Sequence, residues 1–504
     1  MKVKLFVTTD IHGNIFPTNY TSRDNVEDYG LARISTAIQT YREQGEIILL
    51  DNGDSFQGTP LTTFAHEHPN EYMNPIAQAF NTLDYDYINL GNHDFNYGRP
   101  ILEKFIKETK APLLTSNLTI DGKAPGQTQI IEKDGKKIAL IGLLTQYIPK
   151  WERPNHIEGM EFFSAYDHLE SEVKRLRNDV DYIIAMYHGG LERDPDTGTP
   201  TERLTGENEG YQLTDIEGLD ILITGHQHRT FVKRVNGVLV TQSTFKGQEF
   251  VTIDLDLENG ESNAKIHEVA KYPVDESFLV PYQEIEQRVQ TWLDQKIGTL
   301  KDGPVTIADE LDARINKHPI VSLLNQIQLD RSGADISSVA LFNNASGFNQ
   351  EITMRDLVST YIYPNTLVVK SMTGKAIKEM LEFNAIYFVV DGNKIVPNPA
   401  YVEPKPQHYN YDMLDGIDYT INVGNPIGER ISDVFFNGKP LNDNDHYKMV
   451  VNNYRAMGGG NFHMVAESET VQEIQEEMVD TIANYFKKNP EVVINHKNNI
   501  TVKI

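Results

Sequence analysis

Five apolar runs in the first half of the chain each end abruptly at a polar residue able to bind a metal ion. The runs are short and rich in β-branched residues, which predicts β-strands. Asp, Asn or His follows each run within a few positions. If these strands are neighbours in one sheet, their ends meet at one edge, and the polar side chains gather there. The runs span residues 3–7, 47–50, 87–90, 182–186 and 221–223.

Segments with helical periodicity separate these strands, and this alternation of strands and helices is typical of an α/β domain. Apolar residues recur three or four positions apart in residues 31–42, 74–83 and 166–176, which predicts amphipathic helices. Apolar runs that lack strong ligand residues predict three further strands. These strands span residues 136–144, 238–241 and 250–257.

The pattern of apolar and polar residues changes in the second half of the chain. Residues 271–280 lose periodicity and contain a proline, which predicts a linker, and residues 281–300 follow as an amphipathic bridging helix. We therefore expect a catalytic domain at 1–270, a helical linker at 271–302 and a smaller α+β domain at 303–504. In that domain the patterns predict helices near 320–329, 374–383 and 471–487, and strands near 338–342, 366–370, 419–423 and 447–452.

Composition limits the class of protein and partner. A chain of 504 residues with 39% hydrophobic residues predicts two or more globular domains. The net charge of −26 argues against binding to a nucleic-acid duplex, and no apolar stretch is long enough to span a membrane. The absence of cysteine excludes thiolate metal ligands. No signal peptide precedes the first strand, so the sequence predicts a cytoplasmic protein, or an extracytoplasmic one if a leader has been removed. The oligomeric state stays open.

The polar residues after the five runs form short motifs that are weak one by one. Each motif has an ordinary alternative, such as an Asp that caps a turn or a partly buried histidine. Hard oxygen and imidazole ligands gathered at one place are, however, what a pair of divalent cations requires. In chain order the motifs contain Asp10 and His12, Asp54, Asn92 and His93, His188, and His226 and His228.

The ordered set D-x-H, G-D, G-N-H-D, H-G-G and G-H-x-H resembles the calcineurin-like metallophosphoesterase superfamily. The resemblance implies a two-sheet αββα sandwich that carries two divalent metal ions, Mn²⁺, Zn²⁺ or similar. It implies that Asp54 bridges the two metals, and that His93 donates a hydrogen bond to the phosphoryl or leaving oxygen. The implied ligands are Asp10, His12, Asp54 and His228 for the first metal, and Asp54, Asn92, His188 and His226 for the second.

The implied chemistry is hydrolysis without a covalent intermediate. A hydroxide shared by the two cations attacks the phosphorus in line, and the cations and His93 stabilise the charge that develops.

The second half resembles the C-terminal domain of 5′-nucleotidases. Three stretches, around residues 91–98, 361–367 and 452–459, look like the 2′,3′-cyclic-nucleotide 2′-phosphodiesterase/3′-nucleotidase branch of that family. Two positions depart from the 5′-nucleotidase pattern, with Asn96 and Gly460 each where that pattern carries an Asp. Segment 343–348 also lacks the arginine that clamps a 5′-phosphate. The resemblance therefore implies a preference for other phosphate positions.

The resemblance also implies the residues that contact a nucleotide. Tyr363 and Tyr454 match the family's aromatic pair, which stacks on the two faces of a base. Taken alone, each tyrosine favours ordinary packing in a strand or loop, and only the resemblance reverses that preference. In segment 343–348, Asn344 and Phe348 are further candidate substrate contacts.

The leading hypothesis is a phosphoric ester hydrolase that opens 2′,3′-cyclic nucleotides and then removes the 3′-phosphate. A 5′-nucleotidase or UDP-sugar hydrolase is the alternative within the enzymes. A non-catalytic nucleotide-binding scaffold is the alternative from another class. The expected partner is a small-molecule nucleotide.

Overall fold

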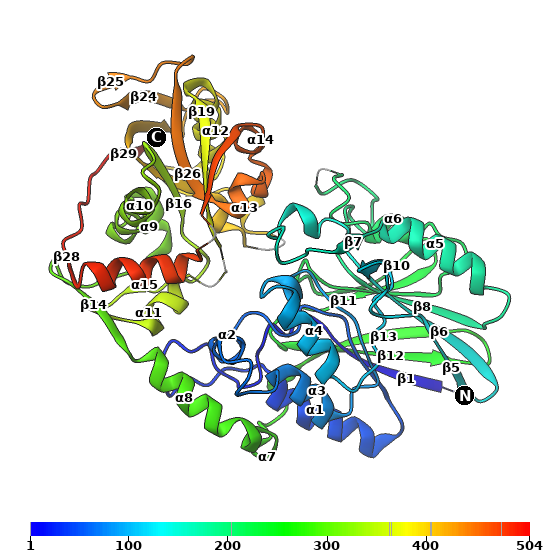
Figure 1. The fold of residues 1–504 in the computed structure, drawn as a ribbon. Helices are drawn as coiled ribbons and strands as arrows, with labels where there is room; N and C mark the ends of the chain where they lie inside the picture. The colour runs from blue at the N-terminus through cyan, green and yellow to red at the C-terminus, as the bar shows by residue number, and fades with distance from the viewer. Residues whose placement is uncertain (1, 203, 362, 364, 404–405, 475) are drawn as a thin grey trace. The chain divides into compact units, whose positions relative to one another are not determined.

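The chain forms two compact units in the computed structural model, which describes every residue except 1, 203, 362, 364, 404–405 and 475 (Figure 1). Unit 1 comprises Met1–Asn19 and Arg23–Val289, and unit 2 comprises Tyr20–Ser22 and Gln290–Ile504. Among the described residues, no helix has the length and apolar character needed to cross a membrane.

Unit 1 contains two β-sheets that share an apolar layer. The first sheet has the strand order β13 (Ser262–Glu268), β12 (Glu249–Asp256), β1 (Lys2–Thr8), β2 (Ile48–Asp51) and β3 (Tyr87–Ile88). The second sheet has the order β10 (Phe231–Val235), β11 (Val238–Gln242), β9 (Ile221–Thr224), β8 (Tyr182–His188), β6 (Lys136–Leu144) and β5 (Gln129–Lys133).

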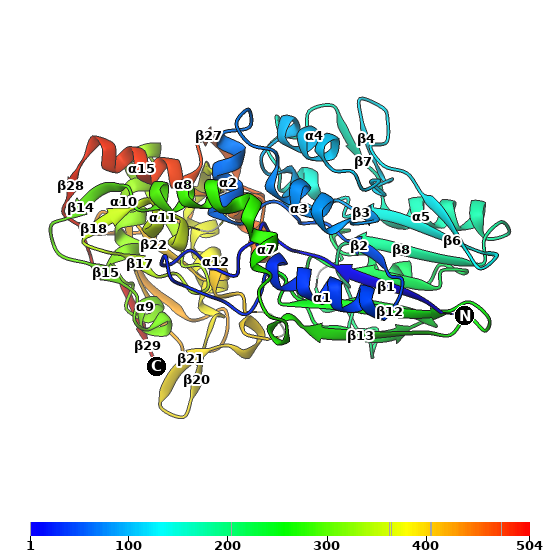
Figure 2. The same cartoon turned by 90° about the horizontal axis from the view of Figure 1, so that it is seen from below.

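Alternation along the strands explains why each sheet has helices on its outer face. In β8, Ile184 and Met186 enter the layer between the sheets, whereas Ile183 and Ala185 join the core that includes α5 (Ala165–Leu176). A strand covered on both faces has no polar side, which is why these runs are continuously apolar. Figures 1 and 2 show α1 (Leu31–Gln44) and α3 (Pro75–Leu83) beside the first sheet. The αββα prediction is confirmed.

The five apolar runs are strands, but they do not belong to one sheet. β1, β2 and β3 lie parallel in the first sheet, and β8 and β9 lie parallel in the second. The strand ends still meet, because polar side chains join the sheets there. Asn52 Nδ2 donates to Tyr187 O at 3.2 Å, and Asn89 Nδ2 donates to Leu143 O at 2.7 Å.

Unit 2 is a mixed α+β unit, as predicted. Its main sheet has the order β22 (Asp412–Asp415), β16 (Ile336–Ala340), β26 (His446–Asn452), β19 (Leu367–Thr373) and β27 (Glu469–Ile474). A second sheet has the order β25 (Lys439–Pro440), β24 (Ile431–Phe436), β23 (Ile417–Asn422) and β29 (Ile500–Lys503). The helices are α9 (Glu310–Ile315), α10 (Pro319–Ser332), α11 (Met354–Thr360), α12 (Gly374–Ala385), α13 (Asn453–Ala456), α14 (His463–Ala466) and α15 (Met478–Lys488).

Three local predictions need correction. The bridging helix α8 (Gln283–Leu293) ends early, and β14 (Lys296–Leu300) follows it, because the β-branched Ile297 and Thr299 favour an extended chain and Gly298 disfavours a helix there. The first residues of the predicted helix at 471–487 instead form β27, an edge strand paired with β19. The supposedly irregular linker contains α7 (Glu276–Leu279), which is fastened to α1 through Ser35 Oγ and Asp275 Oδ2 at 2.7 Å.

The sequence patterns also left several elements unassigned. In unit 1 these include α2 (Pro60–Glu67), α4 (Arg99–Glu108), α6 (Gly210–Leu213), β4 (Leu118–Ile120) and β7 (Met160–Phe162). In unit 2 they include β15 (Val305–Thr306), β17 (Gly347–Phe348), β18 (Glu351–Thr353), β20 (Phe388–Asp391), β21 (Lys394–Pro397) and β28 (Glu491–Val492).

Candidate active site

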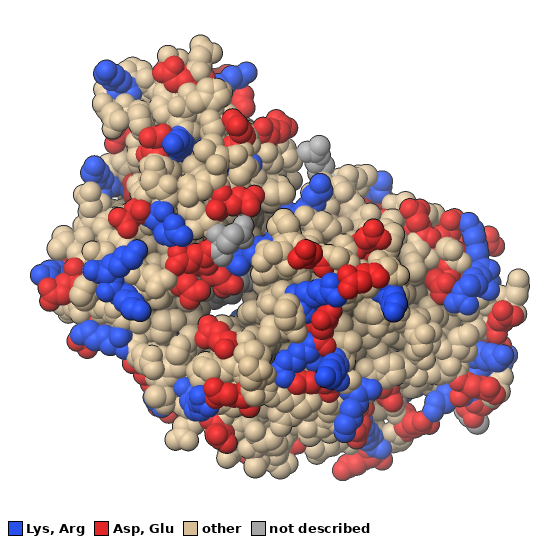
Figure 3. Space-filling model, in the orientation of Figure 1, with Lys and Arg blue, Asp and Glu red and all other residues tan. Residues whose placement is uncertain are grey.

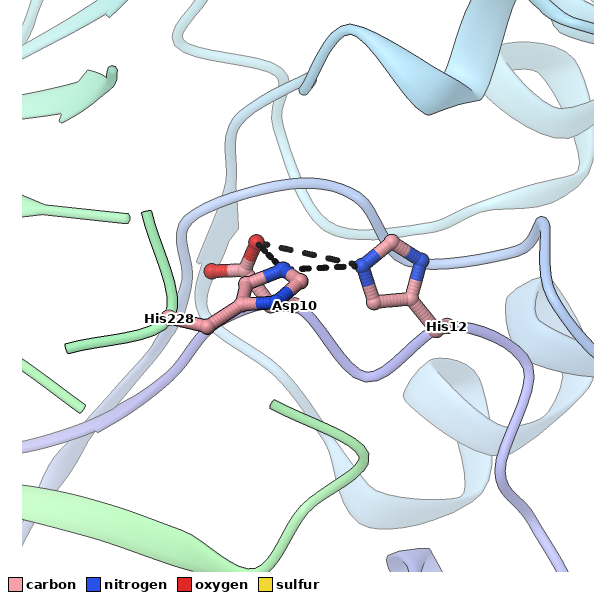
Figure 4. A group of neighbouring side chains, drawn as sticks. All are labelled: Asp10, His12 and His228. Atoms are coloured by element: carbon pink, nitrogen blue, oxygen red, sulfur yellow. Dashed lines mark hydrogen bonds and ion pairs between the residues drawn. The ribbon is translucent and has the colours of Figure 1, made fainter. Parts of the chain in front are cut away.

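Three of the predicted ligands meet just beyond β1 and β9. His228 Nε2 lies 3.2 Å from Asp10 Oδ1, and His12 Nε2 lies 3.9 Å from the same oxygen (Figure 4). The two imidazole Nε2 atoms are 3.3 Å apart. One ligand atom from each of the three residues falls within 4.8 Å of the others, which suits a single cation.

A second group adjoins the first and comes from the ends of β2, β8 and β9. Asp54, His188 and His226 also offer ligand atoms within 4.8 Å of one another. His188 Nε2 lies 3.1 Å from Asp54 Oδ2, and His226 Nδ1 lies 2.7 Å from Asn92 Oδ1. The structure therefore brings together all seven side chains predicted as metal ligands.

Asp54 connects the two groups. Its Oδ2 lies 3.1 Å from His188 Nε2 and 3.9 Å from His12 Nε2. Among the described residues, Asp54 Oδ2 and His188 Nε2 are fully buried yet make no hydrogen bond. Buried polar atoms are rarely left in that state, and these two atoms lie 3.1 Å apart as an ion pair. The donor set of carboxylate, amide and imidazole groups fits two divalent cations.

Backbone carbonyls aim two of the imidazoles. His12 Nδ1 lies 3.0 Å from Gln57 O, and His188 Nδ1 lies 2.7 Å from Asn52 O. A carbonyl only accepts, so Nδ1 carries a proton in both rings and Nε2 is the nitrogen directed into the cluster, where a cation would take the place of any proton on it. Sequence reasoning missed these contacts, because a main-chain acceptor leaves no side-chain signal.

Aromatic rings support the other two imidazoles. Trp151 stacks on His226 at 5.5 Å between ring centroids, and Phe245 stacks on His228 at 4.6 Å. Glu207 Oε1 lies 3.2 Å from His226 Nε2, which turns Nδ1 of that ring toward Asn92. Sequence reasoning missed all three residues, since they lie in loops without a motif.

The loops that present the ligands adopt a backbone conformation that side chains rarely take. Such residues cost about 1–3 kcal/mol each and gather at functional sites. Asp and His adopt this conformation more often than most residues, and Asp does so in ordinary turns of this chain, but five of the ligand residues share it here. This concentration indicates that the loops are shaped to converge their side chains. Positive φ angles occur at Asp10 (53°), His12 (49°), Asp54 (53°), His226 (68°) and His228 (55°).

Two residues of the G-N-H-D motif shape the loop around Asp54. A Cβ at Gly91 would lie 2.3 Å from Asp54 Oδ1, so only glycine allows this approach. Asp94 accepts hydrogen bonds from the backbone N–H groups of Asp54, Ser55 and Gly91 at 2.8–3.0 Å. Asp94 thus fixes the loop rather than binding in the cluster.

The buried charges of the cluster shift one another's pKa. Burial opposes ionisation of Asp10, but His188 and His228 outweigh it and lower the pKa of this carboxyl group. Burial also opposes a charged His188, but Asp54 and Asp10 outweigh it and raise its pKa to about 10. Burial, aided by His93, lowers the pKa of His12 to about 4. The carboxylates therefore stay ionised, as cation ligands must.

His93 lies beside the cluster and is absent from both ligand groups. Its backbone N–H donates to Asp54 Oδ1 at 2.7 Å, and its ring centroid is 5.4 Å from that of His12. The ring is only partly buried. This position suits a hydrogen-bond donor to a substrate oxygen.

In unit 2, the two candidate tyrosines extend from the same end of the β19–β26 pair. Leu367 and Asn452 are partners in the register, and Asn453 N donates to Thr366 O at 2.9 Å. Tyr363 and Tyr454 flank these positions and are partly exposed. Tyr363 also packs edge-on against Phe342, with 5.3 Å between ring centroids.

The other two candidate substrate contacts differ from each other. Asn344 is exposed, with its backbone N–H donating to Glu310 Oε1 at 3.0 Å. Phe348 in β17 is 0% exposed and belongs to the core of unit 2. The prediction that Phe348 contacts substrate is therefore wrong, since a side chain closed off from solvent cannot reach a ligand.

Comparison with known proteins gives the family. Residues 3–230 match the calcineurin-like phosphoesterase model, and residues 296–467 match the model of the 5′-nucleotidase C-terminal domain. A Staphylococcus aureus structure described as a candidate 5′-nucleotidase is 34% identical, covers all of both chains and superposes with a TM-score of 0.92. The chain belongs to the 5′-nucleotidase family of calcineurin-like phosphoesterases. Its members are phosphoric ester hydrolases, and the predicted enzyme class is confirmed.

Relatives within this family carry different activities. A 2′,3′-cyclic-nucleotide 2′-phosphodiesterase/3′-nucleotidase of Salmonella typhimurium is 27% identical over 91% of this chain and 81% of its own length. A 5′-nucleotidase of Vibrio vulnificus is 24% identical over 98% of this chain and 93% of its own length. The family is thus shared, and the substrate has to be argued from individual residues.

Proposed function

We propose that the chain is a metal-dependent hydrolase that opens 2′,3′-cyclic nucleotides and removes the 3′-phosphate. The observation that carries the hydrolytic part is the pair of adjoining ligand groups, Asp10–His12–His228 and Asp54–His188–His226. On the face drawn in Figure 3, basic side chains are interspersed with acidic ones, which is consistent with a small-molecule substrate rather than a polyanion.

Each region has a separate task. Two divalent cations, Mn²⁺, Zn²⁺ or similar, would supply an activated water and bind the phosphate oxygens. Asp54 would hold both cations, and Asn92 would complete the second ligand group through Oδ1. His93 would donate a hydrogen bond to the phosphoryl or leaving oxygen as charge develops there. Tyr363 and Tyr454 would stack on the base, which tolerates any base identity.

Three positions favour the cyclic and 3′-substrates. Asn96 replaces the family's Asp after His93. At Gly460, with φ 71°, an added Cβ would lie 2.2 Å from Asn410 Oδ1, so the loop here has no room for the Asp of the 5′-nucleotidase pattern. Segment 343–348 carries no arginine.

The buried arginines nearest these loops have structural partners. Arg314 Nη2 donates to Leu341 O at 3.0 Å, and Arg455 is paired with Asp412 at 2.8 Å. Both side chains are at most 2% exposed. Neither offers its charge to a 5′-phosphate.

A 5′-nucleotidase or UDP-sugar hydrolase is the second candidate, because relatives named as 5′-nucleotidases cover the full chain. Hydrolysis rates measured with Mn²⁺ on four substrates distinguish the two candidate functions. The substrates are 2′,3′-cyclic AMP, 3′-AMP, 5′-AMP and UDP-glucose. We expect kcat/KM to be highest for the first two substrates. A dominant rate on 5′-AMP or UDP-glucose would overturn the proposal in favour of the second candidate.

A further inference from the structure

The ring of Tyr454 lies directly against the main chain of Gly459. A Cβ added at Gly459 would lie 2.5 Å from Cε1 and Cζ of that ring and 2.6 Å from its Cδ1. Carbon atoms in contact are about 3.5–4.0 Å apart, so no side chain fits between the ring and the loop. Any residue other than glycine at position 459 would push the ring out of its place.

The backbone at Gly459 does not itself require glycine. Gly458 and Gly460 on either side have φ angles of 91° and 71°, which favour glycine, but Gly459 has no positive φ. It begins the short helix η7 (Gly459–Asn461). The close approach of the Tyr454 ring therefore explains why this position lacks a side chain.

Arg455 holds the two segments that contact the Tyr454 ring. Its Nη1 donates to Gly459 O, and its Nη2 donates to Tyr409 O at 3.0 Å. The Tyr409 ring meets the Tyr454 ring edge-on, with 6.5 Å between centroids and 74° between planes. One guanidinium group thus fixes the main chain of both neighbours of the ring.

Arg455 is itself held in place. Its Nε and Nη2 donate to the two carboxylate oxygens of Asp412 at 2.9 Å and 2.8 Å, and its Cζ lies 3.7 Å from the ring centroid of Phe462. The side chains of Arg455 and Asp412 are 2% and 4% exposed. A buried bidentate pair that also stacks on an aromatic ring has little freedom to move. Since Asp412 begins β22, the main sheet of unit 2 determines where Gly459 lies.

An aromatic ring that is already fixed loses less conformational entropy when a base stacks on it. Tyr454 is only partly buried, so the core of unit 2 does not enclose its ring. We propose that Gly459, held by Arg455, is a positioning residue that fixes the plane of the Tyr454 ring for stacking on the base. This inference rests on the stacking role of Tyr454 in the proposed function.

Gly459→Ala tests the proposal with a single methyl group. The methyl group displaces the Tyr454 ring, whereas the ligand cluster lies in unit 1 and keeps its residues. We expect KM for 3′-AMP and 2′,3′-cyclic AMP to rise about 5- to 50-fold, with kcat changed less than about 2-fold. KM for the base-free ribose 2′,3′-cyclic phosphate should stay the same.

Gly424→Ala is the matched control. Gly424 also has no positive φ, and a Cβ there would lie 3.5 Å from its nearest neighbour, an ordinary contact. The control carries the same loss of freedom in the unfolded chain as Gly459→Ala. It should leave KM for every substrate unchanged.

A double variant shows whether the effect passes through the ring. In Tyr454→Ala the ring that the methyl group would strike is absent, so adding Gly459→Ala should change KM by less than about 2-fold. If Tyr454→Ala raises KM but Gly459→Ala does not, or if Gly459→Ala raises KM equally in both backgrounds, the proposal is overturned.

Urea unfolding gives a readout that does not depend on turnover. Fluorescence of Trp292 in a Trp151→Phe background follows unit 2 of the full chain. We expect Gly459→Ala to lower the unfolding midpoint relative to Gly424→Ala, and to lower it no further once Tyr454 is alanine. An unchanged midpoint in Gly459→Ala contradicts the inference, because the ring then moves aside freely. The expected midpoints together with an unchanged KM in Tyr454→Ala contradict only the proposed function.

Discussion

The ligand cluster around Asp54 in unit 1 and the loops that carry Tyr363 and Tyr454 in unit 2 differ in burial and in backbone strain. In the cluster, Asp10, Asp54 and His188 are 0% exposed, and the backbone is strained to bring ligands together. In the loops, Tyr363 and Tyr454 keep part of each ring exposed and pack through ordinary contacts. Charge stabilisation requires groups fixed in a dry place, whereas stacking requires open faces. The same division predicts which kinetic constant each region controls.

The largest effect should come from the residue that connects the two ligand groups. Asp54→Asn removes a charge that both groups share, so kcat should fall by at least about 10³-fold for every substrate. Steady-state kinetics with 3′-AMP and with ribose 2′,3′-cyclic phosphate measures this fall in kcat. Asp134→Asn is the matched control, because Asp134 has the same φ of 53° in an exposed turn, and it should behave as wild type. Near-normal kcat in Asp54→Asn would contradict the shared role.

His93→Ala should have the next largest effect. Loss of a hydrogen bond to the developing charge lowers kcat about 10²- to 10³-fold, while bound metal stays the same because His93 belongs to neither ligand group. Metal content measured by mass spectrometry on the variant separates the two roles. A variant that loses its metal would show that His93 is a ligand instead.

Tyr454→Ala should act on KM rather than kcat. A stacked base contributes about 1–3 kcal/mol, so KM for 3′-AMP should rise about 5- to 150-fold. Tyr454→Phe keeps the ring and should stay close to wild type. The base-free ribose 2′,3′-cyclic phosphate should not distinguish the three proteins, and an equal loss on that substrate would place Tyr454 outside base recognition.

The last effect concerns stability rather than turnover, and it should be confined to unit 1. Burial raises the pKa of Asp51 to about 7, despite hydrogen bonds from Ser55, Thr8 and Gly53. The folded state then keeps a proton that the unfolded state releases near pH 4, so the free energy of unfolding falls as pH rises from about 4 to about 7. The slope is about 1.4 kcal/mol per pH unit. Asp51→Asn has no carboxyl group to titrate, so its free energy of unfolding should not show this fall with pH.

The two tryptophans allow each unit to be followed separately. Trp151 lies in unit 1 and Trp292 in unit 2. Urea unfolding with chelator at pH 5 and pH 7.5, in Trp292→Phe and Trp151→Phe backgrounds, should show the effect of Asp51→Asn only through Trp151. An equal change at Trp292 would mean that the effect is not local.

The sequence predicted the cluster better than its surroundings. Asp10, His12 and His228 lie in recognisable motifs because the motifs consist of the candidate ligand side chains themselves. The groups that aim them are backbone carbonyls of Asn52 and Gln57, or loop residues such as Trp151, and these leave no pattern.

The fold shows the same limit. Continuous apolar runs predicted most strands of the two sheets of unit 1, but not how the strands divide between the sheets, because each strand is apolar on both faces and gives no sign of its neighbour. Phe348 illustrates a related error. Its position in a family motif suggested a substrate contact, whereas the register of β17 with β15 turns it into the core.

Anomalous diffraction from crystals equilibrated with Mn²⁺ would locate the cations themselves. We predict two peaks per chain, one among Asp10, His12, Asp54 and His228 and the other among Asp54, Asn92, His188 and His226. Their separation should be about 3.5–4 Å. A map without peaks at these residues, or with a single ion that Asp54 does not touch, would contradict this prediction.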